Sequence, residues 1–137
     1  WGREHTFYEG GEYGVEHIDF TQPYCEALRT KLITAGKQAG IEVFNYATYA
    51  ATQGPRLETP AEINRLDKDG CHIVGMTGMP EAALAREAGL CYASISVVAN
   101  MAAGRGEGEI TMEEINQNLG TGMERVRAIL AAVIPAI

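Results

Sequence analysis

Segments with the apolar spacing of a helix alternate along this chain with segments that have the composition of a buried strand. Between residues 21 and 40 apolar side chains recur on one helical face, and residues 41–51 are rich in β-branched and aromatic side chains. The predicted helices are 21–40, 60–69, 80–88 and 111–133, and the predicted strands are 41–51, 71–76 and 91–99. This order predicts an α/β fold with a helix-flanked sheet and short connections.

The predicted helices carry recognisable end signals. Thr21-Gln22-Pro23 has a hydroxyl followed by proline, which predicts a helix start. Thr59 with Glu62, and Thr111 with Glu114, have the spacing of a capping box. Glycine follows three of the helices, as expected for the left-handed position after a helix: Gly40, Gly70 and Gly89.

The run from Cys91 to Ala99 has too few polar residues to form an exposed face, so we expect helices to cover this strand on both sides. The glycine-rich segment 102–109 lacks the strand–helix context of a dinucleotide site and is interpreted as a hairpin or flexible loop. The last helix has an apolar inner stripe: Ile115, Leu119, Met123, Val126, Ile129, Leu130 and Val133.

Composition is that of one globular domain. The chain has 137 residues, 46% hydrophobic and 21% charged, which is enough to bury a core. Its net charge is −7, an acidic balance that argues against nonspecific nucleic-acid binding but leaves an anionic small ligand open. We expect no membrane span, because no apolar run is long enough, and no signal-peptide pattern is seen.

The cysteines and histidines do not have the spacing of a metal site. Cys25, Cys71 and Cys91 are odd in number and widely separated. We interpret them as small buried hydrophobic residues of a reduced, cytoplasmic protein, in preference to a disulfide or a zinc site.

Three polar residues follow a strand or precede a helix: Glu58, Thr77 and Asn100. Ligands of open α/β sheets bind outside the carboxyl ends of strands, so we expect one pocket for a nitrogen heterocycle and an anion. Met76-Thr77-Gly78 could hold phosphate at a helix start, although no Walker sequence is present. By spacing alone, a solvated glutamate and a chain-turning asparagine are the simpler interpretations.

Three segments of the chain are similar to a known family: GPRLETPAEINRL, VGMTGMPEAALAREAGLCYAS and VVAN. They resemble the trimeric purine nucleoside phosphorylase and 5′-methylthioadenosine phosphorylase family, and within it the bacterial enzymes for S-methyl-5′-thioinosine. The resemblance implies a three-layer domain with a central mixed β-sheet flanked by helices. It also implies a homotrimer.

Members of that family are considerably longer than this chain. The resemblance implies that residues 1–137 are the C-terminal portion of a single phosphorylase domain, and that the N-terminal phosphate-binding half is absent. That half carries a glycine-rich phosphate loop and an Arg-His pair. We therefore expect the chain alone not to be catalytically competent.

The resemblance assigns roles to residues around the purine and the ribose. Glu58 matches the glutamate that binds N1–H of a 6-oxopurine, and Leu57 takes the place of a phenylalanine that packs on base and ribose. Asn100 matches the catalytic asparagine that binds the purine at N7 and O6. Met76 matches the methionine under the ribose, and Thr77 matches the hydroxyl residue that contacts phosphate.

Three further positions bear on substrate choice. Ala102 stands where adenine-specific relatives carry a second aspartate, which together with Asn100 and Glu58 favours hypoxanthine over adenine. Met112 replaces the histidine that binds a ribose 5′-hydroxyl, as suits a methylthio group. His17 matches a histidine that a neighbouring subunit contributes to the 5′ pocket.

The implied activity is that of a pentosyltransferase of purine salvage. It would phosphorolyse S-methyl-5′-thioinosine to hypoxanthine and 5-methylthioribose 1-phosphate, with phosphate as co-substrate and neither cofactor nor metal. Phosphorolysis of methylthioadenosine, or of 6-oxopurine nucleosides in general, is the first alternative. A non-catalytic, oligomerising, purine-binding protein is the second.

Overall fold

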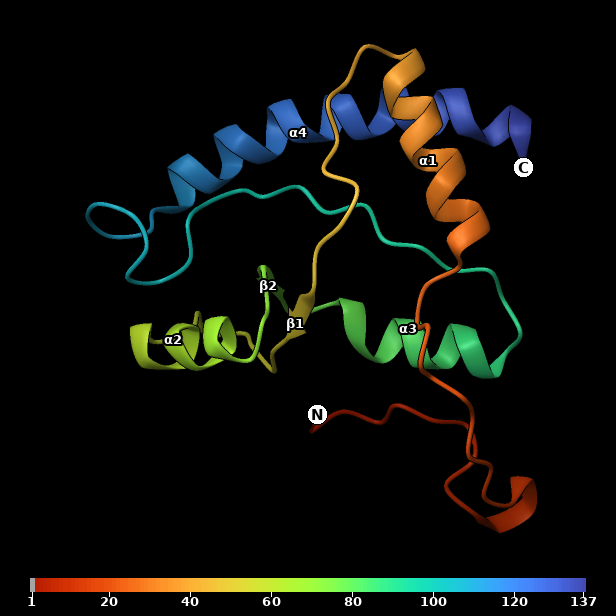
Figure 1. Cartoon of the computed structure of the whole chain (residues 1–137). Coiled ribbons are helices and arrows are strands. Elements are labelled where there is room, and N and C mark those ends of the chain that lie inside the picture. The colour runs from red at the N-terminus through yellow and green to blue at the C-terminus, as the bar shows by residue number, and fades with distance from the viewer. Residues whose placement is uncertain (1) are drawn as a thin grey trace.

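A computed structural model describes residues 2–137 of the chain (Figure 1). In this part of the chain the helices are α1 (Glu26–Gln38), α2 (Pro60–Lys68), α3 (Gly78–Glu87) and α4 (Met112–Val133), and the strands are β1 (Tyr49–Ala51) and β2 (Ile73–Gly75). Short 3-10 helices, η1 (Gly11–Tyr13) and η2 (Ile134–Ala136), lie near the two ends. The predicted order of helices and strands is confirmed except at residues 91–99.

The two strands form a parallel pair. Tyr49 pairs with Ile73, and Ala51 pairs with Gly75. A parallel pair needs a crossover connection, and α2 supplies it between β1 and β2. Figure 1 shows α2 and α3 on opposite sides of this pair. The expected α/β fold is confirmed, while the sheet of residues 2–137 has two parallel strands and is not mixed.

Helices α1 and α4 pack against each other in a separate layer (Figure 1). Ala35 of α1 and Ile129 and Val133 of α4 form a buried cluster there. Gly36 allows α1 to approach the segment after it, because a Cβ at this position would lie 3.2 Å from Val43 Cγ1. Partly buried apolar residues surround the cluster: Leu32, Ile41, Val43, Ile95 and Ala132.

The expected strand at 91–99 is wrong in one respect, because this segment is extended but belongs to no ladder. No strand of residues 2–137 runs beside it to accept its backbone hydrogen bonds. Ile95 and Val97 on one face are half-buried, and Val97 packs against Gly122 of α4. Val98 on the other face is 67% exposed, so the expectation that both faces are covered is also wrong.

Two predicted boundaries at the first helix and strand are corrected. The helix starts at Glu26 and not at Thr21, because the Thr21 hydroxyl donates to Asp19 Oδ1 at 2.7 Å instead of capping a helix. The strand predicted over 41–51 is limited to β1, whose three residues pair with β2.

Side-chain caps explain why α2 and α4 begin where the sequence predicts, with the full capping box present at α2 and only its Thr111 half present at α4. Thr59 Oγ1 accepts from the Glu62 N–H at 3.2 Å, and Glu62 Oε2 accepts from the Thr59 N–H at 2.7 Å. Thr111 Oγ1 accepts from the Glu114 N–H at 3.3 Å. Two residues of the predicted inner stripe of α4, Met123 and Leu130, are exposed. The stripe is confirmed at the other five positions, which are at least half-buried: Ile115, Leu119, Val126, Ile129 and Val133.

The cysteine prediction is wrong, because Cys25 and Cys91 form a disulfide with Cα atoms 5.1 Å apart. Cys71 is free and half-buried. The Cys25 N–H donates to the Tyr92 carbonyl at 2.8 Å, and the rings of Tyr24 and Tyr92 stack with centroids 6.0 Å apart. These contacts bring the two cysteines together although they are far apart in the sequence. The bond removes the cysteine argument for a reduced compartment.

Residues 2–20 form an irregular leader that α3 holds in place. The carboxylate of Glu87 accepts from the Phe7 N–H at 2.7 Å and from the Thr6 hydroxyl. Arg86 Nε donates to the Asp19 carbonyl at 3.3 Å. Among the helices of residues 2–137, none has both the length and the apolar character that a membrane crossing needs.

The disulfide closes a separation of 66 residues, and in the chain-entropy model a loop of this size stabilises by about 4 kcal/mol. We expect Cys25→Ser to lower the free energy of unfolding by about 2–4 kcal/mol in denaturant titrations. The control Cys71→Ser keeps the bond and is expected to stay near wild type. Equal losses in the two variants, or no cross-linked peptide containing Cys25 and Cys91 in non-reducing mass spectrometry, would contradict the pairing.

Candidate active site

The carboxyl ends of β1 and β2 lie side by side and carry the first part of the site. The Thr52 N–H donates to the Gly75 carbonyl at 2.9 Å, which continues the pairing one residue beyond β1. The Thr52 hydroxyl donates to Glu58 Oε1 at 2.7 Å. Glu58 is half-buried, and this bond holds its carboxylate at the edge of the sheet where the sequence predicts a ligand.

The loops that follow the two strands also contact each other. Gly54 has φ +61°, and a Cβ at this position would collide with the Met76 sulfur. Only glycine therefore lets the Gly54 turn pack this closely on the residue that follows β2. The contact places Met76 and Thr77 at the same edge of the sheet as Glu58.

A shallow cavity of about 350 Å³ opens beside Glu58, between β1 and α2. Arg56 and Glu62 line it and form an ion pair at 2.8 Å. The Arg56 guanidinium and the hydrogen bonds from Thr59 hold the pKa of Glu62 well below its usual range. Other lining residues are Ala50, Ala51, Thr52, Gln53, Gly54, Glu58, Arg65, Leu66 and Cys71. Of the predicted site residues, only Glu58 lines this cavity.

The side-chain hydroxyl of Tyr49, a residue of β1, lies at the start of α3, where the sequence predicts a phosphate. The N–H groups of Thr77 and Gly78 each donate to the Tyr49 hydroxyl oxygen at 3.3 Å. Because this oxygen uses both N–H groups, phosphate contact at Thr77 would rest on its exposed hydroxyl. That role stays a prediction.

Sequence reasoning missed Tyr49, although the neighbouring glycines carry a signal. A Cβ at Gly75 would collide with the Tyr49 hydroxyl, and a Cβ at Gly78 would lie 2.9 Å from the ring. The two glycines on either side of Met76 and Thr77 therefore make room for one aromatic side chain. Their spacing could have indicated a bulky residue packed against this turn.

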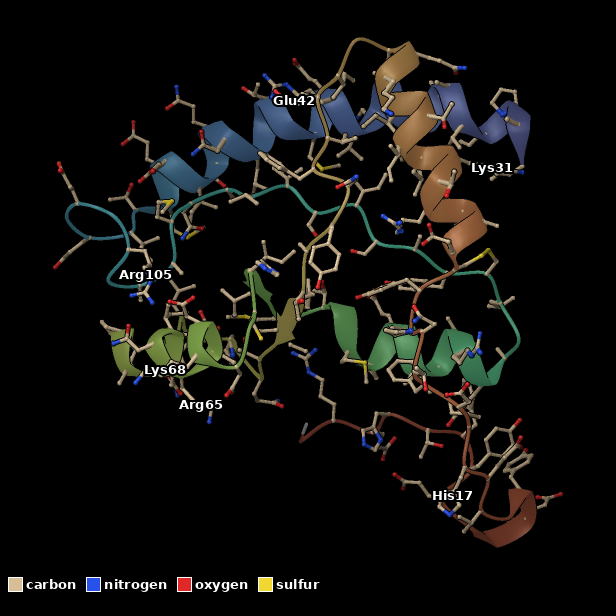
Figure 2. The ribbon with its side chains drawn as sticks, viewed as in Figure 1. His17, Lys31, Glu42, Arg65, Lys68 and Arg105 are labelled. Atoms are coloured by element: carbon tan, nitrogen blue, oxygen red, sulfur yellow. A yellow bond between two sulfur atoms is a disulfide. The ribbon has the colours of Figure 1, made fainter. Side chains whose placement is uncertain are left out.

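Asn100 is half-buried, and its Nδ2 donates to the Met101 carbonyl at 2.8 Å. The chain then crosses to α2, where Gly104 packs against Pro60. Arg105 forms an ion pair with Asp67 at 2.8 Å, and Figure 2 shows it between this loop and α2. The segment interpreted as a flexible loop is therefore anchored. No hydrogen bond of residues 2–137 joins Asn100 to Glu58.

The remaining predicted site residues lie apart from this edge or on the surface. Leu57 is 48% exposed and Met112 is 65% exposed, so neither has an apolar enclosure within this chain. Ala102 is half-buried at the start of the anchored loop. Figure 2 shows His17 on the leader, far from β1 and β2. The structure thus gathers Glu58, Met76 and Thr77 at one edge of the sheet.

Comparison with known proteins identifies the family to which this chain belongs. Residues 2–135 match the model of the phosphorylase superfamily. A probable S-methyl-5′-thioinosine phosphorylase of Pseudomonas syringae pv. tomato is 56% identical over 135 residues, 98% of this chain and 55% of that protein. A probable 6-oxopurine nucleoside phosphorylase of Dictyoglomus turgidum is 48% identical over 98% of this chain and 51% of that protein.

A solved structure has the same fold. Methylthioadenosine phosphorylase from Schistosoma mansoni in complex with adenine superposes with a TM-score of 0.91 at 29% identity, covering 99% of this chain and 55% of that one. This chain therefore spans about half the length of the curated relatives and of the structure it matches. The resemblance seen in the sequence is confirmed, and the chain belongs to the phosphorylase superfamily.

Proposed function

We propose that the intact gene product is a pentosyltransferase that phosphorolyses S-methyl-5′-thioinosine to hypoxanthine and 5-methylthioribose 1-phosphate. In this proposal, residues 1–137 are the C-terminal portion of a single phosphorylase domain. Phosphate is the second substrate, and no cofactor or metal takes part. The observation that carries the proposal is the 56% identity to a probable S-methyl-5′-thioinosine phosphorylase over 98% of the chain.

The reaction needs help at the leaving base and at the phosphate. A phosphate oxygen forms a bond to the anomeric carbon as the bond from that carbon to the purine nitrogen breaks, and the bonding electrons leave with the purine. Charge on the base grows only in the transition state, so the amide of Asn100, donating to N7, would stabilise that state selectively. The Thr77 hydroxyl would orient the phosphate.

Base choice would depend on Glu58, Asn100 and Ala102. An ionised carboxylate only accepts hydrogen bonds, so Glu58 suits the N1–H of hypoxanthine and not the unprotonated N1 of adenine. The Thr52 hydroxyl, which already donates to Glu58, supports this orientation. A wrong base would leave buried polar groups unpaired, which is a strong basis for rejection.

The 5′ end of the nucleoside would be chosen by apolar contacts. The apolar Met112 side chain would contact the 5′-methylthio group of the substrate, whereas a ribose 5′-hydroxyl would find no hydrogen-bond partner there. Leu57 would pack on the base and the ribose. Both are largely exposed in this chain, so the proposed pocket needs enclosure from elsewhere. We propose a homotrimer in which a neighbouring subunit contributes His17. The cytoplasmic location stays a prediction, now without support from the cysteines.

General phosphorolysis of 6-oxopurine nucleosides is the second candidate, because a relative 48% identical carries that description. The assay is phosphate-dependent release of free base by the intact gene product from methylthioinosine, methylthioadenosine and inosine. We expect methylthioinosine to give the highest kcat/KM. Preference for inosine would support the second candidate, and preference for methylthioadenosine would contradict the base assignment. Purine binding without turnover would identify a non-catalytic protein.

Asn100→Asp tests the base site. The carboxylate cannot donate to N7, so we expect kcat/KM for methylthioinosine to fall about 10²–10³-fold. The ratio of methylthioadenosine to methylthioinosine turnover should rise. The matched control is Asn116→Asp, on the exposed surface of α4, which adds the same charge and should leave both rates unchanged. An unchanged base preference in Asn100→Asp would count against the assignment.

Met112→His tests the 5′ pocket. An imidazole can hydrogen-bond a 5′-hydroxyl, so we expect kcat/KM for inosine relative to methylthioinosine to rise about tenfold, the effect of one added hydrogen bond. Met123→His is the control, because Met123 is also exposed on α4 but is not a predicted site residue. The same ratio in wild type and Met112→His would remove the argument for a thioether pocket.

A further inference from the structure

Arg3 of the leader reaches across to the edge of the sheet and contacts three backbone carbonyls. Its Nη2 donates to the Gln53 carbonyl at 2.8 Å. Its Nη1 donates to the Met76 carbonyl at 2.5 Å and approaches the Met79 carbonyl at 3.4 Å. The contacts join residues 50 to 76 positions apart in the sequence, so this one side chain connects the leader to two separate loops.

The acceptors lie in the two loops that carry the candidate site. Gln53 follows β1 and leads through the Gly54 turn to Glu58, and Met76 follows β2 and precedes Thr77. Among residues 2–137, no other hydrogen bond reaches the Gln53 or the Met76 carbonyl. Arg3 therefore joins the loop that leads to Glu58, the predicted purine-binding residue, to the turn that carries Thr77, the predicted phosphate-binding residue. It does so through the backbone carbonyls of Gln53 and Met76, which follow the two strands.

A second observation shows that the leader is fitted closely to this place. Gly2, next to Arg3, has φ +80°, and a Cβ there would lie 2.9 Å from Gln53 Oε1. The positive φ favours glycine at this position, and the short distance shows that the leader backbone lies against the Gln53 side chain. In the same turn, the Tyr49 hydroxyl oxygen accepts the N–H groups of Thr77 and Gly78. The turn is held through its amides by Tyr49 and through its carbonyls by Arg3.

We propose that Arg3 is a positioning residue that fixes the spacing between the Gln53–Glu58 loop and the Met76–Gly78 turn. This inference rests on the proposed function for its kinetic consequence: base and phosphate would be bound in the geometry needed for attack on the anomeric carbon. Arg3 touches neither substrate and acts through Glu58 and Thr77. A guanidinium suits this role because its donors form a rigid planar fork that spans separate acceptors.

Arg3 is exposed, so its hydrogen bonds compete with water and contribute little to overall stability. Its effect is therefore expected on loop geometry and not on unfolding. Arg3→Lys keeps the charge but replaces the fork with a single ammonium. Arg86→Lys is the matched control, because Arg86 is also exposed and also connects to a backbone carbonyl, that of Asp19, at 3.3 Å.

In the intact gene product we expect Arg3→Lys to lower kcat/KM for both nucleoside and phosphate about ten- to hundredfold, as misplaced binding groups do. The thermal midpoint should stay near wild type, and Arg86→Lys should match wild type in both measurements. A purely structural role would instead lower the midpoint. Equal kinetics for Arg3→Lys and Arg86→Lys would overturn the inference.

Amide hydrogen exchange separates this inference from the proposed function. In Arg3→Lys we expect faster exchange in peptides covering residues 53–58 and in peptides covering 76–79, with no change in Arg86→Lys. Faster exchange in only one segment, or in neither, would overturn the coupling. If wild type shows no phosphorolysis, the proposed function fails, and the exchange data still decide whether Arg3 joins the two loops.

Discussion

The pairing of Ala51 with Gly75, at the carboxyl ends of two parallel strands, is the constraint on which the candidate site depends. It brings two loops to one edge, and Thr52 extends the pairing by donating its N–H to the Gly75 carbonyl. The Thr52 hydroxyl then fixes Glu58, so the orientation of this carboxylate follows directly from strand register. A slip of one residue would turn Thr52 to the other face of the sheet and free Glu58.

Close approach of the backbone is the second requirement, and small residues provide it. Gly54 admits the Met76 side chain, and Gly75 and Gly78 admit the ring of Tyr49. The hydroxyl oxygen of Tyr49 then satisfies N–H groups at the start of α3 that would otherwise need solvent or a ligand. Packing and hydrogen bonding thus determine the shape of the turn that carries Thr77 before any substrate is considered.

The predicted site residues of this chain differ in how far the surrounding structure buries them. The edge with Glu58, Met76 and Thr77 is supported by the sheet, whereas Leu57 and Met112 face solvent. A nucleoside pocket must bury most of its ligand, so in the proposed function further surfaces would complete this one. The span of about half the length of the relatives and the proposed trimer both agree with an open site in this chain.

The sequence by itself determined most of the helices, because side-chain caps and helix-ending glycines act over a few neighbouring residues. The family and the residues at the sheet edge followed from the resemblance of the Gly-Pro and Met-Thr-Gly motifs to those of a known family. It could not determine that 91–99 lies outside a ladder, since strand pairing needs a partner supplied by the fold. Nor could it pair Cys25 with Cys91, or bring Arg3 to Gln53 and Met76. These contacts join distant segments, and only the packing of the whole chain decides them.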